Sequence, residues 1–465
     1  MRLVCSICGE EYGVEEDIAN CPRCKAPLIF EYALDEYKED FVDYEVKSIW
    51  RYNILPKGKN LITLGEGNTY LHKSRSLSEE LGYEGELFLK DESTNPTGSF
   101  VDRGIAVAVS HATNKNFRTV ATVSPGNIGA SLAAYASKAG LTSLIYTPLN
   151  IESGKLYQIL MYNGRVYPVQ DIERGIEEAL ERADGDTYLI LPNNPYYLEG
   201  VKTIAYEIYE DMDRASPDLV VVPMGHGALI FSVWKGFLEL KKLGFIDRLP
   251  KMVGVQFKGA SPIVDRLTGE VSEALSVVAP ELSISNPLNM NLALTAIKDS
   301  GGFGIRVDYQ DAVNALRLLA EKEGLFVELA AASTIPAVKY MLNHTTPKKI
   351  VCILTGHGLK DPATIRELTR SIRERLGLDT GERRVIGRTK IEILRAIKDG
   401  NSYGYAIWKY LGRRGIAIKL PTIYQHLSEL ERMGLIKIIS KSGLKRQTTI
   451  YGLTTRGRYV LRYLG

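Results

Sequence analysis

The decisive stretch of this sequence is Asn95-Pro96-Thr97-Gly98-Ser99-Phe100-Val101-Asp102-Arg103-Gly104. It follows the apolar run 86–90 and leads into the alanine- and valine-rich run 105–112, so the local order is strand, polar turn and helix. The turn brings backbone N–H groups, Thr97 and Ser99 to the N-terminus of a helix, an arrangement that suits an anion. The sequence therefore predicts a ligand site at this turn.

Residues from about 60 to 375 repeat this alternation of short apolar runs and longer helical patterns. The strand-like runs are 118–123, 143–147, 219–223, 252–256 and 350–354. Such alternation predicts an α/β fold with a parallel sheet. Turns rich in glycine and serine follow several of these runs, and open α/β sheets bind ligands at those strand ends.

The stretch 95–104 closely resembles the cofactor-lysine motif of threonine synthases, which are fold-type II enzymes that use pyridoxal phosphate (PLP). The family motif reads Asn-Pro-Thr-Gly-Ser-Phe-Lys-Asp-Arg-Gly, and its lysine forms the Schiff base. This sequence has Val101 at that position. A valine has no amine, so it can neither hold PLP covalently nor move a proton, and we expect no catalytic residue here.

Four further stretches carry the resemblance, in the family's order. The run 64–69 resembles the entry motif, and 124–131 resembles the loop that holds the substrate carboxylate. The run 222–229 resembles the glycine-rich loop around the PLP phosphate, and 354–362 resembles the motif whose threonine bonds the pyridine nitrogen. The resemblance implies a ligand site made of Ser99, Ser124, Gly126, Asn127, Ile128, Gly129, Gly225, His226, Gly227, Ala228 and Thr355.

Two more departures from the family fall at phosphate sites. The phosphate loop reads Gly225-His226-Gly227-Ala228-Leu229 and lacks one glycine and two amide side chains of the family form. Threonine synthases hold the substrate phosphate with an arginine where this sequence has Tyr197. A dianion without that guanidinium is poorly compensated in a closed pocket. We therefore expect no covalent PLP, doubtful PLP binding of any kind, and a ligand less charged than phosphohomoserine.

Cysteines cluster at the N-terminus as two CxxC pairs, Cys5–Cys8 and Cys21–Cys24. Four thiolates at this spacing match tetrahedral Zn²⁺. We interpret residues 1–30 as a zinc ribbon, in which the metal stabilises a segment too short to form a hydrophobic core of its own. Direct DNA contact and redox chemistry are the alternatives. The fifth cysteine, Cys352, lies in an apolar run and is interpreted as a buried thiol.

The C-terminal region is strongly basic. Residues 381–465 hold 18 Lys and Arg against 5 Asp and Glu, although the net charge of the whole chain is only +3. A basic segment on an acidic body points to a polyanionic partner. We place the body at 31–376, a linker at 377–388 and a separate domain at 389–465.

The pattern of this last domain predicts a winged helix-turn-helix. Helices are expected at 390–397, with Thr389 as cap, at 402–411 and at 420–434, followed by strands 435–440 and 448–453 and a last helix. Segments 422–424 and 451–454 resemble the PadR-like repressor family. The third helix would contact DNA bases, and the wing, which is the hairpin with the basic turn 441–447, would contact phosphates. The expected DNA contacts are Thr422, Tyr424, Gln425, His426, Lys441, Lys445 and Arg446. A surface or packing role for His426, and a protein partner for the domain, remain open.

Composition excludes a membrane-spanning class. Hydrophobic residues make up 45% of the chain and charged residues 24%, which is ordinary for globular proteins. No window approaches the ~20 apolar residues of a membrane helix, and the first residues lack a signal-peptide core, so we expect a cytoplasmic protein.

The leading hypothesis is a transcriptional regulator that acts as a dimer. Its body would be a catalytically inactive threonine-synthase-like domain that senses an amino acid or relative. The rival is a PLP-dependent lyase or synthase that uses a displaced lysine, with Lys90, Lys202, Lys258 and Lys360 as candidates and an autoregulatory tail. A scaffold whose tail binds protein is the third reading.

Overall fold

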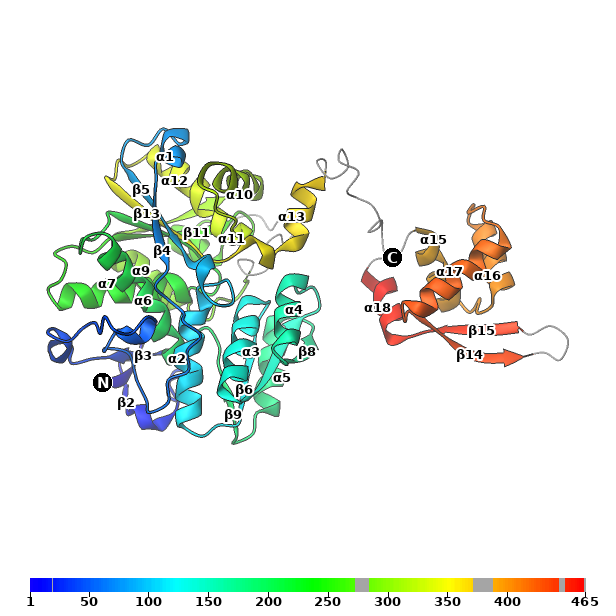
Figure 1. The fold of residues 1–465 in the computed structure, drawn as a ribbon, viewed down its shortest axis with the longest axis horizontal. Helices are drawn as coiled ribbons and strands as arrows, with labels where there is room; N and C mark the ends of the chain where they lie inside the picture. The colour runs from blue at the N-terminus through cyan, green and yellow to red at the C-terminus, as the bar shows by residue number, and fades with distance from the viewer. Residues whose placement is uncertain (19, 272–283, 371–387, 443–447, 464–465) are drawn as a thin grey trace. The chain divides into compact units, whose positions relative to one another are not determined.

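A computed structural model describes residues 1–18, 20–271, 284–370, 388–442 and 448–463 of the chain. It separates into two compact units, 1–368 and 369–465, which are described individually. Figure 1 shows the body as helices packed around two sheets. Among the described residues, no helix is long and apolar enough to cross a membrane.

The larger sheet of the body has six strands in the order β12-β11-β10-β13-β5-β4, all parallel except the edge strand β4. Their bounds are β4 Tyr70–Ser74, β5 Glu86–Asp91, β10 Leu219–Pro223, β11 Lys251–Phe257, β12 Phe303–Val307 and β13 Lys349–Leu354. The central strands β10 and β13 are apolar apart from Lys349 at the start of β13, because both faces of the sheet are buried, as expected of a parallel sheet. The helices associated with this half are α1 Ser76–Glu80, α6 Pro195–Asp211, α7 Ala228–Lys242, α8 Pro262–Thr268, α9 Met290–Asp299, α10 Tyr309–Glu323, α11 Leu329–Ala332, α12 Thr334–Leu342 and α13 Pro362–Leu368.

The smaller sheet is fully parallel, with the strand order β8-β7-β6-β9. Its strands are β6 Thr119–Val123, β7 Thr142–Pro148, β8 Arg165–Val169 and β9 Thr187–Leu189, with helices α3 Asn127–Ala139, α4 Ser153–Met161 and α5 Ile172–Arg182. The predicted α/β body with parallel sheets is confirmed. The predicted helix 363–376 is described only in part, as α13, because residues 371–376 lie outside the described residues.

Helix α2, Val101–Asn114, lies at the centre of the body and contacts both α3 and α6. Every residue from Val101 to Ala112 is buried. Small side chains permit this close packing. A Cβ on Gly104 would come within 2.4 Å of the Tyr197 ring, and one on Gly200 within 2.0 Å of the Arg103 carbonyl oxygen. The stretch 95–104 thus enters the helix that joins the two halves of the body.

The N-terminal segment forms an antiparallel sheet in the order β2-β1-β3, with β1 at Arg2–Cys5, β2 at Glu11–Tyr12 and β3 at Leu28–Glu31. Its buried side chains, which include Leu3, Leu28 and Phe30, belong to the main core of the body. The segment therefore packs on the body rather than enclosing a core of its own.

The second unit contains α15 Arg388–Lys398, α16 Gly404–Arg413, α17 Leu420–Arg432, the hairpin β14 Ile436–Ser442 and β15 Thr448–Leu453, and α18 Thr455–Tyr463. This is the predicted order of elements. Several boundaries differ from the prediction by one or two residues. At the helix starts, α15 already includes Arg388 and Thr389, so Thr389 does not precede the helix and Arg388 is not linker, and α16 begins only at Gly404. At the ends, α16 extends to Arg413, α17 stops at Arg432 and β14 extends to Ser442. Ile423, Leu427 and Leu430 are buried along one face of α17, as their spacing predicts.

Candidate functional site

The turn before α2 is held by its own side chains. Asp102 accepts hydrogen bonds from the Thr97 backbone N and Oγ1, both at 2.7 Å, and from Ser131 Oγ at 2.5 Å. Burial raises the pKa of Asp102, while these donors oppose the shift. Ser99 forms a bridge with Gly356, and the Phe100 N–H donates to the Thr355 carbonyl oxygen over 3.0 Å. These contacts tie the turn to the end of β13 and fix Val101 as the first residue of α2.

Behind the turn, Arg103 is completely buried and bridges two carboxylates. Its guanidinium donates to both oxygens of Glu92 and both oxygens of Glu207, each at 2.7 Å. These charges hold the pKa of Arg103 well above its usual value, against the opposing effect of burial. Lys90 adds a 3.0 Å contact to Glu207. A paired network of this kind stabilises a scaffold only while every member has its partner.

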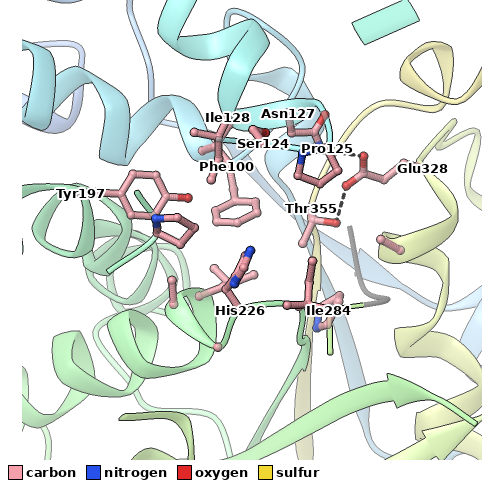
Figure 2. A pocket seen from close by; sticks show the side chains of 18 residues that line it. Phe100, Ser124, Pro125, Asn127, Ile128, Tyr197, His226, Ile284, Glu328 and Thr355 are labelled. Atoms are coloured by element: carbon pink, nitrogen blue, oxygen red, sulfur yellow. Dashed lines mark hydrogen bonds between the residues drawn. The ribbon is translucent and has the colours of Figure 1, made fainter. Parts of the chain in front are cut away.

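A pocket of about 100 Å³ opens where the turn, α3 and α7 meet (Figure 2). This volume exceeds the ~10–15 Å³ that one water requires, so the pocket can hold a small metabolite. The Phe100 ring lies near its centre. The described lining consists of Phe100, Val101, Ser124, Pro125, Asn127, Ile128, Pro192, Tyr197, Pro223, Gly225, His226, Gly227, Ala228, Leu229, Ile284, Glu328, Ala330 and Thr355.

Eight of the predicted ligand residues line this pocket: Ser124, Asn127, Ile128, Gly225, His226, Gly227, Ala228 and Thr355. Three do not. Ser99 is buried with no hydrogen-bond partner for its Oγ among the described residues. Gly126 caps α3 at a φ of 154°, where a Cβ would meet the Lys155 side chain, and Gly129 packs against Ile145. These two glycines position the loop through close packing.

Glu328 is the charged side chain of the described lining that sequence reasoning missed. Its carboxylate accepts from Thr355 Oγ1 at 2.8 Å and from Asn127 Nδ2 at 3.0 Å (Figure 2). Asn127 Oδ1 is buried without a partner in the described structure. The pocket therefore offers a carboxylate and a free carbonyl oxygen, which suit a ligand that donates N–H groups.

The opposite wall is the N-terminus of α7, where the first N–H groups have no intrahelical acceptor. Gly227 has a φ of 87°, and a Cβ there would come within 2.9 Å of Ala293. Removal from water lowers the pKa of His226 to about 4, so its ring is neutral at neutral pH. This wall can accept an anionic group through backbone dipoles, without a cationic side chain.

Tyr197 and Pro192 give the third wall an apolar character. Tyr197 is 1% exposed and follows the Asn194 cap of α6, whose side chain accepts from the Tyr196 and Tyr197 N–H groups. Burial raises the pKa of Tyr197, so the phenol stays neutral. The wall that resembles the substrate-phosphate site of the family therefore carries no charge.

A covalent PLP site needs a lysine, and the described lining contains neither lysine nor arginine. The four candidate lysines bind elsewhere. Lys90 pairs with Glu207, Lys202 with Glu239, and Lys258 with Asp308. Lys360 donates to the Thr97 carbonyl oxygen and to Gln158 Oε1, both at 2.8 Å. The helix terminus suits a phosphate, but the described lining offers no residue that could hold the cofactor covalently.

The N-terminal cysteines fit a tetrahedral metal site. Their sulfur atoms all lie within 4.8 Å of one another, with 3.3 Å between Cys5 and Cys24, 3.7 Å between Cys8 and Cys21, and 3.6 Å between Cys8 and Cys24. Zn–S bonds of ~2.3 Å in a tetrahedron separate the sulfurs by about 3.8 Å. Although burial opposes it, donation from the Tyr12 hydroxyl and neighbouring backbone N–H groups lowers the pKa of Cys21 to about 6.

In the second unit, α17 presents Tyr424 and Gln425 to solvent, while Thr422 and His426 are half-buried. His426 Nδ1 lies 3.4 Å from Glu429, which Lys390 also contacts at 2.8 Å. Lys441 is at the end of β14. Lys445 and Arg446 lie outside the described residues, so their predicted DNA contacts stay predictions.

Comparisons with known proteins match both units. The family model for pyridoxal-phosphate dependent enzymes matches residues 62–356, and that for PadR-like transcriptional regulators matches 393–463. A threonine synthase from Methanocaldococcus jannaschii is 39% identical over 384 residues, which cover 78% of this chain and 94% of that protein. A threonine synthase from Methanosarcina acetivorans is 36% identical over 381 residues, with coverages of 78% and 93%.

Among solved structures, maize serine racemase aligns with a TM-score of 0.57 at 21% identity, over 67% of this chain and 94% of that chain. An O-ureido-L-serine synthase variant aligns with a TM-score of 0.55 at 20% identity, over 70% of this chain and all of that chain. At these identities the likeness shows the fold of the body.

Proposed function

Because the chain belongs to the family of pyridoxal-phosphate dependent enzymes, has threonine synthases among its relatives and ends in a PadR-like domain, we propose that it is a DNA-binding regulator whose body has lost catalysis and senses a small metabolite. The observation that carries this proposal is the lining of the pocket. Its described part has no amine to hold PLP and no guanidinium to neutralise a substrate phosphate. PLP, when covalently bound in this family, supplies an electron sink for carbanion chemistry.

The sensed ligand is an amino acid or a close relative. Glu328 and the free Oδ1 of Asn127 suit an ammonium group. The N-terminus of α7 suits a carboxylate. The remaining walls, which include Val101, Ile128 and Tyr197, favour an uncharged side chain. A ligand changes DNA affinity only to the extent that it binds two conformations of the protein differently.

The four N-terminal cysteines bind one structural Zn²⁺. Their sulfur distances match a closed tetrahedral site, which leaves no coordination position for a substrate. Metal content of the purified chain, measured before and after treatment with a chelator, tests this part of the proposal. About one zinc per chain is expected, and its loss in a Cys21→Ser variant.

The DNA-binding unit acts as part of a dimer, with half-sites about one helical turn apart. The test is selection of genomic fragments by the full-length protein at several salt concentrations. We expect enrichment of a two-fold symmetric sequence, with affinity that falls as salt rises. Equal recovery of all fragments at every salt concentration would refute the proposal.

The second candidate function is a PLP-dependent lyase or synthase of the threonine-synthase type. The 39% identity to a threonine synthase over most of the body favours it. Borohydride treatment of the protein with PLP separates the two candidates, because it traps an imine on whichever lysine forms one. Trapped PLP on one lysine, with turnover of an amino-acid substrate, would establish the enzyme. Absence of trapped PLP and of turnover supports the regulator.

A further inference from the structure

The N-terminal ribbon touches the pocket wall through a pair of asparagines. Asn193 Nδ2 donates to Asn20 Oδ1 over 2.8 Å, although the two residues are 173 positions apart. Asn20 immediately precedes the predicted metal ligand Cys21, and Asn193 immediately follows Pro192, which lines the pocket. Asn193 is buried whereas Asn20 is exposed, so the contact reaches from the surface ribbon to the interior.

The same wall is joined to the α7 side of the pocket by Asn289. This buried residue donates from Nδ2 to the Pro192 carbonyl oxygen over 3.1 Å, and from its backbone N–H to the His226 carbonyl oxygen over 3.0 Å. Two walls of the pocket are therefore held by one residue, through its side chain on one side and its backbone on the other. With Asn193, they form a continuous path from the ribbon to the start of α7.

A second set of contacts supports the segment 192–197, which includes the pocket residues Pro192 and Tyr197. Asp17 of the ribbon segment hydrogen-bonds His111 of α2, and it also lies 3.2 Å from Lys115 Nζ. The His111 ring stacks on Tyr196, with ring centroids 3.7 Å apart. Tyr196 precedes the pocket residue Tyr197 at the start of α6, so both ends of the segment 192–197 are held from the ribbon side.

We infer that metal binding in the ribbon positions the pocket, with Asn20, Asn193 and Asn289 as positioning residues that act through Pro192 and His226. Asn20 directly precedes the metal ligand Cys21, and its described backbone contact within the ribbon is a bridge to Pro27, next to the bond from the Cys21 N–H to the Ala26 carbonyl oxygen. The contacts of Asp17 with α2 hold the segment three residues earlier, so the metal is the nearer anchor of Asn20. Loss of the ion frees the loop that carries Asn20. The segment 192–197 and the start of α7 then lose a common support. The pocket walls become more mobile without any change in the residues that line the pocket.

Hydrogen exchange on the full-length protein tests this inference without a ligand. Amides of 190–199 and 226–231 are compared between zinc-loaded and chelator-treated protein, with β13 at 349–354 as the reference. Removal of zinc should accelerate exchange in both segments by roughly 2- to 10-fold, the range expected for loss of one net hydrogen bond. Exchange in β13 should stay unchanged.

Variants at the exposed position Asn20 separate positioning from general stability. Asn20→Ala, with zinc still bound, should exchange as fast as the metal-free protein in both segments and respond little to the chelator. Asn20→Asp keeps the acceptor oxygen and should behave as the wild type, as should Asn314→Ala on the exposed face of α10.

The inference rests on the zinc binding proposed above, and zinc content measured on the same samples distinguishes the two failures. A protein that binds no zinc overturns both. A protein that binds zinc but shows the same exchange at 190–199 and 226–231 after its removal overturns the coupling alone. The selection of genomic fragments, which tests DNA binding, does not depend on whether zinc binds or on whether zinc changes the exchange rates.

Discussion

Thr355 donates through its hydroxyl to the Glu328 carboxylate over 2.8 Å inside the pocket. The other carboxylate oxygen accepts from Asn127. By resemblance, Asn127 and Thr355 are the residues that would contact the phenolic oxygen and the ring nitrogen of PLP. In this chain one carboxylate connects both, so the polar part of the pocket is organised around Glu328.

Replacement of Glu328 should destabilise the body. Glu328→Ala leaves the buried Thr355 hydroxyl and the half-buried Asn127 amide without their acceptor. An unsatisfied buried donor costs about 1–3 kcal/mol and a half-buried one less, so the free energy of unfolding should fall by roughly 1–4 kcal/mol. Glu328→Gln keeps one acceptor and should cost less. Urea unfolding of the body measures both, with Glu321→Ala on the exposed face of α10 as the matched control, expected within ~0.5 kcal/mol of wild type. A loss below ~0.5 kcal/mol for Glu328→Ala would contradict the role assigned to this carboxylate.

Val101→Lys should restore a covalent link to PLP without restoring turnover. Val101 is 2% exposed and lines the pocket at the start of α2, so an amine there faces the ligand space. Borohydride trapping followed by peptide mass analysis should locate PLP on residue 101 in the variant. Turnover stays absent because Tyr197 still replaces the arginine of the family.

Val271→Lys controls for non-specific modification, because Val271 is 88% exposed. PLP trapped in the wild-type pocket would contradict the proposed loss of covalent binding. Turnover of O-phosphohomoserine by Val101→Lys would show that the loss rests on this one residue.

Tyr197→Arg should create an anion site. The guanidinium would lie in the pocket beside the N-terminus of α7, and affinity for inorganic phosphate measured by calorimetry should rise at least ~10-fold, since a charge-assisted hydrogen bond contributes about 1.5–3 kcal/mol. The body should also become less stable, because the new charge is buried without a carboxylate partner. Tyr70→Arg, at a residue 67% exposed, should change neither property. Unchanged phosphate affinity in Tyr197→Arg would mean that the third wall does not face the ligand.

Local sequence patterns were sufficient for most of the body. The strands 119–123, 219–223 and 349–354 are largely apolar because both faces of a parallel sheet are buried, and the family motifs lie at their ends. Eight motif residues line one pocket for that reason. The boundaries of α15 and α16 were less predictable, since a polar first turn does not mark a helix start.

Contacts between distant segments were not predictable in this way. Glu328 follows a β-bridge between Val327 and His357 and meets Asn127 across 201 positions. A buried glutamate next to Thr355 is visible only once the segments are folded together. Gly126 and Gly129 lie outside the described pocket lining and pack closely against Lys155 and Ile145, and a sequence pattern does not distinguish a glycine needed for packing from one needed for binding.

The stability of the body should depend on Lys360 between pH 8 and 9.5. Burial lowers the pKa of this lysine from 10.5 to about 8, although Asp102 and Glu328 oppose the shift. Above pH 8 the folded lysine loses its proton while the unfolded one keeps it, so the unfolded state binds more protons and the free energy of unfolding rises with pH. Below pH 8 the lysine is charged in both states and the penalty of its burial remains.

Comparison with Lys360→Met isolates this contribution, because other groups titrate alike in both proteins. The stability of wild type relative to the variant should increase by about 1–2 kcal/mol from pH 8 to 9.5. Lys138→Met, at an exposed position on α3, should leave the pH dependence of wild type intact. Parallel pH profiles for wild type and Lys360→Met would contradict the lowered pKa.

Gln425 and the wing should contribute to DNA binding in different ways. Gln425 is exposed on α17, and a glutamine there can bond bidentately to adenine in the major groove. Gln425→Ala should weaken binding to the selected sequence by about 1–3 kcal/mol, roughly 5- to 150-fold, and leave non-specific binding unchanged. Gln310→Ala, on the exposed surface of the body, is the matched control.

Alanine at Lys441, Lys445 and Arg446 should instead weaken binding to every sequence alike. Each phosphate contact removed lowers the slope of log affinity against log salt by about 0.9, because fewer counterions are released. Fluorescence anisotropy with specific and scrambled duplexes at several salt concentrations measures both effects. Equal loss on both duplexes for Gln425→Ala would assign the residue to backbone contact, and an unchanged salt slope in the triple variant would remove the wing from the DNA interface.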